Sequence, residues 1–295
     1  MASTIKYYVG VDGGGTSCRA RICDLEGHCL GEAKTGSANI MLGGSVAMAS
    51  IQDAIATAAS LANLTEADYG SMSVGLALAG AEQKESWHEF MALPHPYGAV
   101  TLNTDAYGAC LGAWKGEEGA ILIAGTGSCG ILLKDKQQQV IGGREFPISD
   151  HGGGAVMGLR LIQQVLLSVD DIVPHTSLAQ HVMKHFDNDV DAVVSWSKTA
   201  RPCDYGQFSP AIFAHAAEGD SLAIEMLKQT AADVEMLLSA LFRRGAEQVC
   251  LMGSIGEHIQ PWLAPPFKTR LALPQGDAMD GAIAMAKGCH NLYPL

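Results

Sequence analysis

The alternation of apolar and polar residues in the first third of the chain predicts a small sheet with one long helix. Apolar runs at 6–11, 17–23 and 28–33 predict three strands of a β-meander, in which a glycine-rich loop separates the first two. Residues 45–62 place apolar side chains at helical spacing, which predicts an amphipathic helix. Apolar runs at 72–78 and 99–102 predict buried strands, and a helix of small residues is expected at 105–114.

The same pattern begins again after residue 118. A strand is expected at 119–124, a Gly/Thr/Ser turn at 125–128, and further strands at 129–133 and around 140–141. Laying Val9 on Ile121 superposes the two glycine turns, which indicates two similar α/β halves. The other explanation is a chance alignment of glycine-rich turns.

The second half of the chain is predicted to be mainly helical. We expect helices at 154–169, 177–186, 209–218 and 221–243, then a strand at 248–252, a turn at 253–256 and a helix at 278–287. At roughly 150 residues per domain, a chain of 295 residues indicates two domains. We expect an N-terminal domain at 1–112 and a C-terminal domain at 113–295, with a hinge near 105–118. The C-terminal helix at 278–290 is expected to pack back onto the first domain.

Composition narrows the class of protein. Charged residues make up only 17% of the chain, against a usual share of about 25%, and hydrophobic residues make up 48%, which excludes a disordered chain. The net charge of −12 opposes phosphate-rich partners, so we expect no binding to nucleic acid or to an acidic membrane surface. We expect neither a secretory signal nor a membrane span. The eight cysteines form no C-x-x-C pair, which favours reduced cysteines in a cytoplasmic protein.

The first glycine turn has the chemistry of a phosphate and metal site. Gly13, Gly14 and Gly15 leave backbone N–H groups uncovered, and Thr16 adds a hydroxyl donor. Asp12 precedes them with a carboxylate that suits Mg²⁺. The alternative is an ordinary glycine-rich hairpin. The chain has no G-x-x-x-x-G-K-[ST] loop and no G-x-G-x-x-G fingerprint, so a P-loop or a Rossmann domain is not indicated.

The second turn repeats this chemistry without an acid, at Gly125, Thr126, Gly127 and Ser128. Two such turns facing each other across a cleft would hold the β- and γ-phosphates of ATP. Asp105 stands where a predicted strand ends and a helix begins, and it could accept the proton of an attacking hydroxyl. The alternative is that Asp105 only caps that helix.

Taken in order, these motifs resemble those of the sugar kinase/Hsp70/actin superfamily. Residues 12–16, 125–128 and 253–256 resemble its phosphate-1, phosphate-2 and adenosine motifs, and 104–109 and 277–284 resemble its connecting helices. Within it the chain is similar to the BadF/BadG/BcrA/BcrD ATPase family, and 37–43, 75–83 and 142–150 are similar to its bacterial glucosamine kinases.

This resemblance implies an α/β fold of two ribonuclease-H-like domains, of the actin/hexokinase type, around a nucleotide cleft. It also implies that ATP and Mg²⁺ are used to phosphorylate the 6-hydroxyl of an amino sugar in chitin catabolism. Glucosamine is the expected sugar, and N-acetylglucosamine is the alternative. Relatives are often homodimers, so a homodimer is implied as well.

The resemblance also assigns roles to single positions. It implies that Asp105 is the catalytic base and that Asp12 is the acid associated with Mg²⁺. The positions implied to bind nucleotide are Gly13, Gly14, Gly15, Thr16, Gly125, Thr126, Gly127, Ser128, Gly253 and Ser254. Those implied to bind the sugar are Asn39, Gly80, Asp105, Gly127, Glu145 and Asp150.

Two departures from the family pattern concern the sugar. The chain has Gly142-Gly143-Arg144-Glu145 where acetylhexosamine kinases usually carry Gly-Gly-Trp-Gly, and Asp150-His151-Gly152-Gly153 where they carry Asp-x-Gly-Ser. The missing serine removes an expected hydroxyl contact. A charged Glu145 suggests an ion pair with the free amine of glucosamine. The alternative is that Arg144 and Glu145 form a solvated surface pair.

Two alternatives lie outside this enzyme class. An ATPase activator of a dehydratase also belongs to the family, but it needs cysteines that hold an iron–sulfur cluster, and no suitable pair follows a glycine-rich motif. A sugar-sensing repressor needs a helix-turn-helix extension, for which we expect no room before the first strand.

Overall fold

The computed structural model describes residues 4–288, which divide into two compact units. Within the described residues, unit 1 comprises 4–121, 131–139 and 273–288, and unit 2 comprises 122–130 and 140–272. The expected division at 112/113 stays a prediction. Within residues 4–288, no helix is long and apolar enough to cross a membrane.

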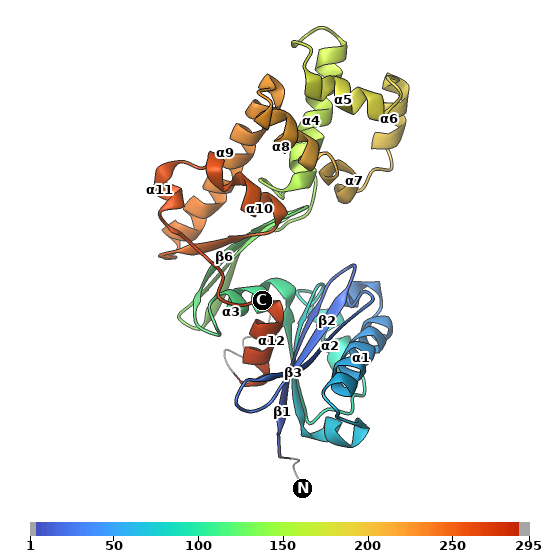
Figure 1. Cartoon of the computed structure of the whole chain (residues 1–295), viewed down its shortest axis with the longest axis vertical. Coiled ribbons are helices and arrows are strands. Elements are labelled where there is room, and N and C mark those ends of the chain that lie inside the picture. Colours follow the sequence, from blue (N-terminus) through green and yellow to red (C-terminus); the bar gives the residue numbers. More distant parts are fainter. Residues whose placement is uncertain (1–3, 289–295) are drawn as a thin grey trace. The chain divides into compact units, whose positions relative to one another are not determined.

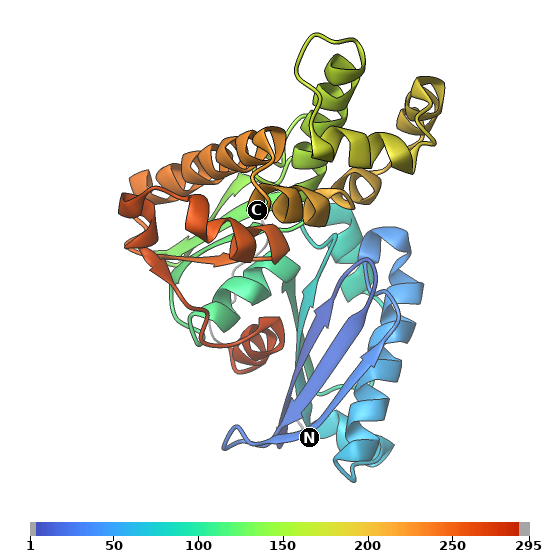
Figure 2. The ribbon, with the colours of Figure 1, turned by 45° about the horizontal axis from the view of Figure 1, so that its top comes forward.

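Unit 1 is built on a five-stranded sheet of order β3-β2-β1-β4-β5. Its strands are β1 (Tyr7–Gly13), β2 (Cys18–Cys23), β3 (Cys29–Thr35), β4 (Met72–Leu78) and β5 (Ala99–Thr104). The first three are antiparallel neighbours, which confirms the predicted meander, and β4 and β5 run parallel to β1. Figure 2 shows the meander in blue with the long helix α1 (Gly44–Leu61) along it.

The two faces of this sheet are covered by different helices. Val9 and Val11 point into the core formed with α1, so Gly10 and Asp12 point to the opposite face. There α12 (Ala278–Ala286) packs against β1, β4 and α3 (Asp105–Ala113). Figure 1 shows α12 beside α3. A Cβ at Gly10 or Gly75 would overlap the backbone of α12, so the small residues of these strands allow the helix to approach closely.

The second sheet has the order β10-β9-β6-β7-β8. Its strands are β6 (Gly119–Ala124), β7 (Ser128–Lys134), β8 (Gln137–Gly142), β9 (Val249–Met252) and β10 (Leu271–Ala272). When this order is given from β8, it is β8-β7-β6-β9-β10. In both sheets the first strand in the sequence, β1 or β6, is therefore central, and the next two strands lie on one side of it. Since β6 contains Ile121 and β1 contains Val9, the internal repeat is confirmed and chance alignment is excluded.

The remaining elements are helices. Unit 2 holds α4 (Gly154–Val169), α5 (Ser177–His185), α6 (Val190–Ser197), α7 (Pro202–Gly206), α8 (Ser209–Ala217), α9 (Ser221–Arg243), α10 (Ser254–Ile259), η3 (Gln260–Trp262) and α11 (Pro265–Lys268). Unit 1 adds η1 (Ile40–Leu42), η2 (Glu66–Ser71) and α2 (Lys84–Met91).

The sequence predictions differ from the structure at one turn and at several short helices. The expected turn at 253–256 is a single residue, Gly253, with φ of 86°, because α10 begins at Ser254. The sequence also gave no indication of α2, α6 and α7, which have eight residues or fewer. Helices this short carry little periodicity and depend on tertiary packing.

Candidate active site

The first glycine turn is the tip of the β1–β2 hairpin. Gly14 N donates to Ser17 O at 2.9 Å, and below the tip Gly13 pairs with Cys18 and Asp12 with Arg19. A Cβ at Gly13 would lie 2.5 Å from Leu78 Cδ2 and 2.8 Å from Ala38 Cβ, so packing requires this glycine.

Gly14 and Gly15 differ from Gly13, because packing does not explain why these two positions are glycine. A Cβ would find no atom closer than 4.0 Å at Gly14 and none within 4 Å at Gly15. Neither residue has the positive φ that favours glycine. Open space beside the backbone of a glycine turn is what a close-fitting anion requires.

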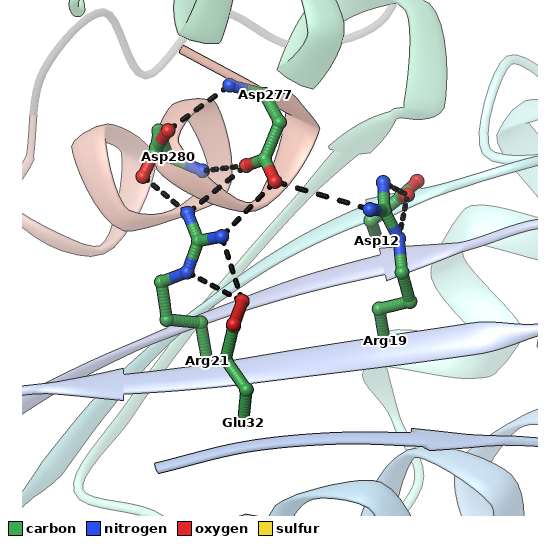
Figure 3. Close-up of polar contacts among 6 residues, drawn as sticks. All are labelled: Asp12, Arg19, Arg21, Glu32, Asp277 and Asp280. Atoms are coloured by element: carbon green, nitrogen blue, oxygen red, sulfur yellow. Dashed lines mark hydrogen bonds and ion pairs between the residues drawn. The ribbon is translucent and has the colours of Figure 1, made fainter. Parts of the chain in front are cut away.

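Asp12 lies on the same hairpin and is held by an arginine. Its Oδ2 accepts from Arg19 Nε at 3.1 Å and from Arg19 Nη2 at 2.6 Å (Figure 3). Sequence reasoning missed Arg19, although hairpin register alone places it opposite Asp12. Within residues 4–288, no group of three or more His, Cys, Asp or Glu is arranged to hold a metal. One carboxylate suits Mg²⁺ nevertheless, since in kinase sites the ion takes one or two carboxylates and completes its shell with phosphate oxygens and water.

Asp105 is the first residue of α3, but it is not the cap. Thr104 is the cap, because its Oγ1 accepts from Tyr107 N at 3.1 Å, so the capping alternative for Asp105 is wrong. Asp105 Oδ1 accepts from the adjacent Ala106 N at 2.7 Å. Burial raises the pKa of the Asp105 carboxyl, and the charges of Asp12 and Glu82 raise it further. A carboxylate whose proton affinity is raised in this way suits general base catalysis.

Two predicted sugar residues of unit 1 lie together. Asn39 caps η1, since its Oδ1 accepts from Met41 N at 2.9 Å. Gly80 has φ of 89°, and a Cβ there would lie 2.9 Å from Asn39 Oδ1. The segment is tied to the glycine turn, because Ala38 N donates to Gly14 O at 3.0 Å. Asn39 and Gly80 thus lie side by side, although they are 41 positions apart in the numbering.

The second glycine turn is fixed against the start of α4. Gly154 N donates to Gly125 O at 2.7 Å, and Ala155 N donates to Thr126 O at 2.9 Å. Gly125 itself resembles Gly15, because a Cβ there would find nothing within 4 Å. These two hydrogen bonds therefore fix the turn, and the space above Gly125 stays open.

Gly127 lies directly against Asp150. A Cβ at Gly127 would stand 2.5 Å from Asp150 Oδ2, so only glycine lets the carboxylate come this close. Burial raises the pKa of the Asp150 carboxyl and the Glu145 charge raises it further, while the Ser128 amide lowers it. Glu145 is exposed, and within the described chain it forms no ion pair with Arg144. The structure thus gathers Gly127, Glu145 and Asp150 in unit 2.

Unit 2 also contains a pocket of about 330 Å³ beside this turn. Gly125, Thr126 and Ser254, all predicted to bind nucleotide, line it. Gly253 comes directly before Ser254 in the chain, and a Cβ at Gly253 would stand 2.5 Å from Ala124 O.

Sequence reasoning did not predict the other residues of the pocket wall, which include Gly206, Ser209, Phe213 and His258. The Phe213 and His258 rings lie 5.5 Å apart, and the buried Ser209 hydroxyl has no hydrogen-bond partner within the described residues. The Ser-Pro pair at 209–210 predicted a helix start, but nothing local predicts that α8 meets α10.

The repeated sheets and their glycine turns define an α/β protein of two ribonuclease-H-like halves, the architecture of two-domain sugar kinases. The chain belongs to the BadF/BadG/BcrA/BcrD ATPase family, whose profile matches residues 9–266.

Two curated relatives and one solved structure, all named as amino-sugar kinases, are similar to this chain over most of its length. Glucosamine kinase GspK of Vibrio cholerae serotype O1 is 66% identical over 290 residues, which covers 98% of this chain and 99% of its own. N-acetyl-D-glucosamine kinase of Dictyostelium discoideum is 24% identical over 258 residues, covering 81% of this chain and 80% of its own. A crystal structure from Chromobacterium violaceum, provisionally named an N-acetylglucosamine kinase, is 30% identical with a TM-score of 0.87 and covers 96% of this chain and 99% of its own.

Proposed function

We propose that this protein is an ATP-dependent glucosamine kinase that transfers the γ-phosphoryl group of ATP to the 6-hydroxyl of D-glucosamine. The observation that carries the proposal is the 66% identity to a glucosamine kinase over 98% of the chain. N-acetylglucosamine kinase is the second candidate, because the two more distant relatives carry that name.

The pocket of unit 2 is assigned to the nucleoside and the glycine turns to the phosphates. Gly14, Gly15 and Gly125 support this assignment, because neither packing nor backbone conformation accounts for them. Mg²⁺ would be held through Asp12 and would neutralise phosphate charge when bound. The chain's excess of acids makes such neutralisation necessary, since bulk charge does not attract the nucleotide.

Asp105 is assigned the role of the base that accepts the proton of the sugar 6-hydroxyl. As the sugar 6-oxygen forms its bond to the γ-phosphorus, the bond from that phosphorus to the departing ADP oxygen breaks. The hydroxyl proton passes to the Asp105 carboxylate. The raised pKa of Asp105 supports this role, because it brings the proton affinity closer to what the transfer needs.

Within unit 1, Asn39 and Gly80 are proposed as sugar-binding residues. Within unit 2, the proposed sugar-binding residues are Gly127, Glu145 and Asp150. Glu145 and Asp150 lie close enough for one charge to raise the pKa of the other carboxyl. Two carboxylates that repel each other favour a cation between them, and glucosamine carries an ammonium group where N-acetylglucosamine carries a neutral amide. A cytoplasmic location, a homodimer and a role in chitin catabolism are further parts of the proposal.

A coupled assay of ADP release tests the function, with ATP and Mg²⁺ against glucosamine, N-acetylglucosamine, glucose and mannose. We expect the highest kcat/KM for glucosamine. A higher value for N-acetylglucosamine selects the second candidate. Absence of sugar phosphorylation together with iron–sulfur absorbance would instead identify an activator of a dehydratase.

A further inference from the structure

Arg19 occupies a defined place in the first glycine hairpin. Antiparallel register sets it directly opposite Asp12, one residue pair below Gly13 and Cys18. Both side chains lie on the face of the sheet that α12 covers, as Figure 3 shows. The Arg19 side chain is 40% exposed and that of Asp12 is 23% exposed, so the pair borders solvent beside the open turn.

The contacts of Arg19 are directional. Its Nε and Nη2 both donate to one oxygen, Asp12 Oδ2, at 3.1 and 2.6 Å. Its Nη1 lies 3.9 Å from Asp277 Oδ2. Within the described residues we find no hydrogen bond to the other oxygen, Asp12 Oδ1.

Asp277, the residue near Arg19 Nη1, is itself held by several hydrogen bonds. It caps α12, since its Oδ1 accepts from Asp280 N at 3.0 Å, and it also accepts from Arg21. Arg19 thus lies between the hydrogen-bonded capping residue of α12 and the carboxylate assigned to Mg²⁺.

We propose that Arg19 is a positioning residue for Asp12: it fixes Oδ2 and leaves Oδ1 available to the Mg²⁺ that would accompany the nucleotide. This inference rests on the proposed function, which assigns Asp12 to Mg²⁺. A guanidinium holds two N–H groups in a rigid plane, whereas a lysine ammonium is a point charge on a flexible stem. Groups that orient a metal ligand from behind typically change metal affinity by about 10–100-fold when removed.

Arg21 provides a matched control on the same strand. It contacts Glu32, Asp277 and Asp280, but no contact joins it to Asp12 in the described chain (Figure 3). Arg21→Gln therefore removes a neighbouring positive charge and its ion pairs, while Asp277 keeps its bond from Asp280 N and Arg19 keeps its bonds to Asp12.

Calorimetric titration of ADP, with Mg²⁺ and with chelator, tests the proposal without measuring turnover. For Arg19→Gln we expect Mg²⁺–ADP binding to weaken by about tenfold or more, while binding of metal-free ADP and the KM for glucosamine stay at wild-type values. Arg19→Lys should restore only part of the loss. Arg21→Gln should change the melting temperature but not the Mg²⁺ dependence. Equal Mg²⁺–ADP binding in Arg19→Gln and wild type, or an equal loss in Arg21→Gln, would overturn the proposal.

The double variant with Asp12→Asn shows whether Arg19 acts through Asp12. If it does, adding Arg19→Gln to Asp12→Asn causes no further loss of Mg²⁺–ADP binding. Losses that multiply would contradict the proposal, because Arg19 would then contact the nucleotide independently. A wild-type protein that binds ADP equally with and without Mg²⁺ would refute the metal role in the proposed function itself, and this inference with it.

Discussion

The variant Gly15→Ala tests whether Gly15 is needed for the stability of the fold or for binding of the nucleotide. The added methyl group meets no atom within 4 Å, and Gly15 does not have a positive φ. Alanine restricts the unfolded chain more than glycine does, so the variant should be more stable by about 0.4–1 kcal/mol. In a unit of this size that corresponds to a melting temperature higher by about 1–4 °C.

The same methyl group stands where the proposed function places phosphate. If the β- or γ-phosphate lies against the N–H groups of this turn, the methyl group forces it away. We expect the KM for ATP to rise by about tenfold or more, which is about 1.4 kcal/mol, with the KM for glucosamine unchanged.

Gly13→Ala is the matched comparison in the same turn. Its methyl group would lie 2.5 Å from Leu78 Cδ2 and 2.8 Å from Ala38 Cβ. Overpacking of this kind costs about 1–3 kcal/mol, so here the melting temperature should fall. Thermal denaturation and steady-state kinetics on both variants measure the two effects. A Gly15→Ala enzyme with the wild-type KM for ATP would refute the reasoning, because the open space would then have no connection with the nucleotide.

Three further substitutions test the sugar site and the base. Asp105→Asn should lower kcat by about 10²–10⁴-fold while calorimetry shows unchanged nucleotide binding. Since the folded-state pKa of Asp105 is raised, its charge destabilises the fold at neutral pH, so this variant should melt higher there. The gain should shrink as the pH falls through the raised pKa and vanish below the ordinary carboxyl pKa, where the folded and the unfolded carboxyl are both protonated. Glu145→Gln should raise the KM for glucosamine but not for ATP, and an unchanged KM would exclude the contact with the amine. Gly127→Ala should displace the Asp150 carboxylate and raise the KM for the sugar; unaltered kinetics would show that Asp150 does not bind it.

The amino-acid sequence by itself determined the strands of the meander, the repeat and the longer helices, together with much of the proposed chemistry. Alternating apolar residues placed the meander and the repeat, because strand and helix periodicity is a local property. The glycine turns and Asp105 were also found locally, since each stands directly after a strand. The two halves of the chain therefore could be recognised before any contact was known.

The tertiary structure alone decided which residues meet. Arg21 reaches Asp277 across 256 positions, and Arg19 and Asp12 gain their connection to α12 through the same aspartate. The pocket that joins the second glycine turn to Ser209 and Ser254 likewise depends on how helices pack. Periodicity shows which face of an element is buried but not which partner buries it, because packing selects partners by shape over the whole chain. For this reason the turns were predictable from the sequence, whereas the contact of Arg19 with the cap of α12 was found only in the folded protein.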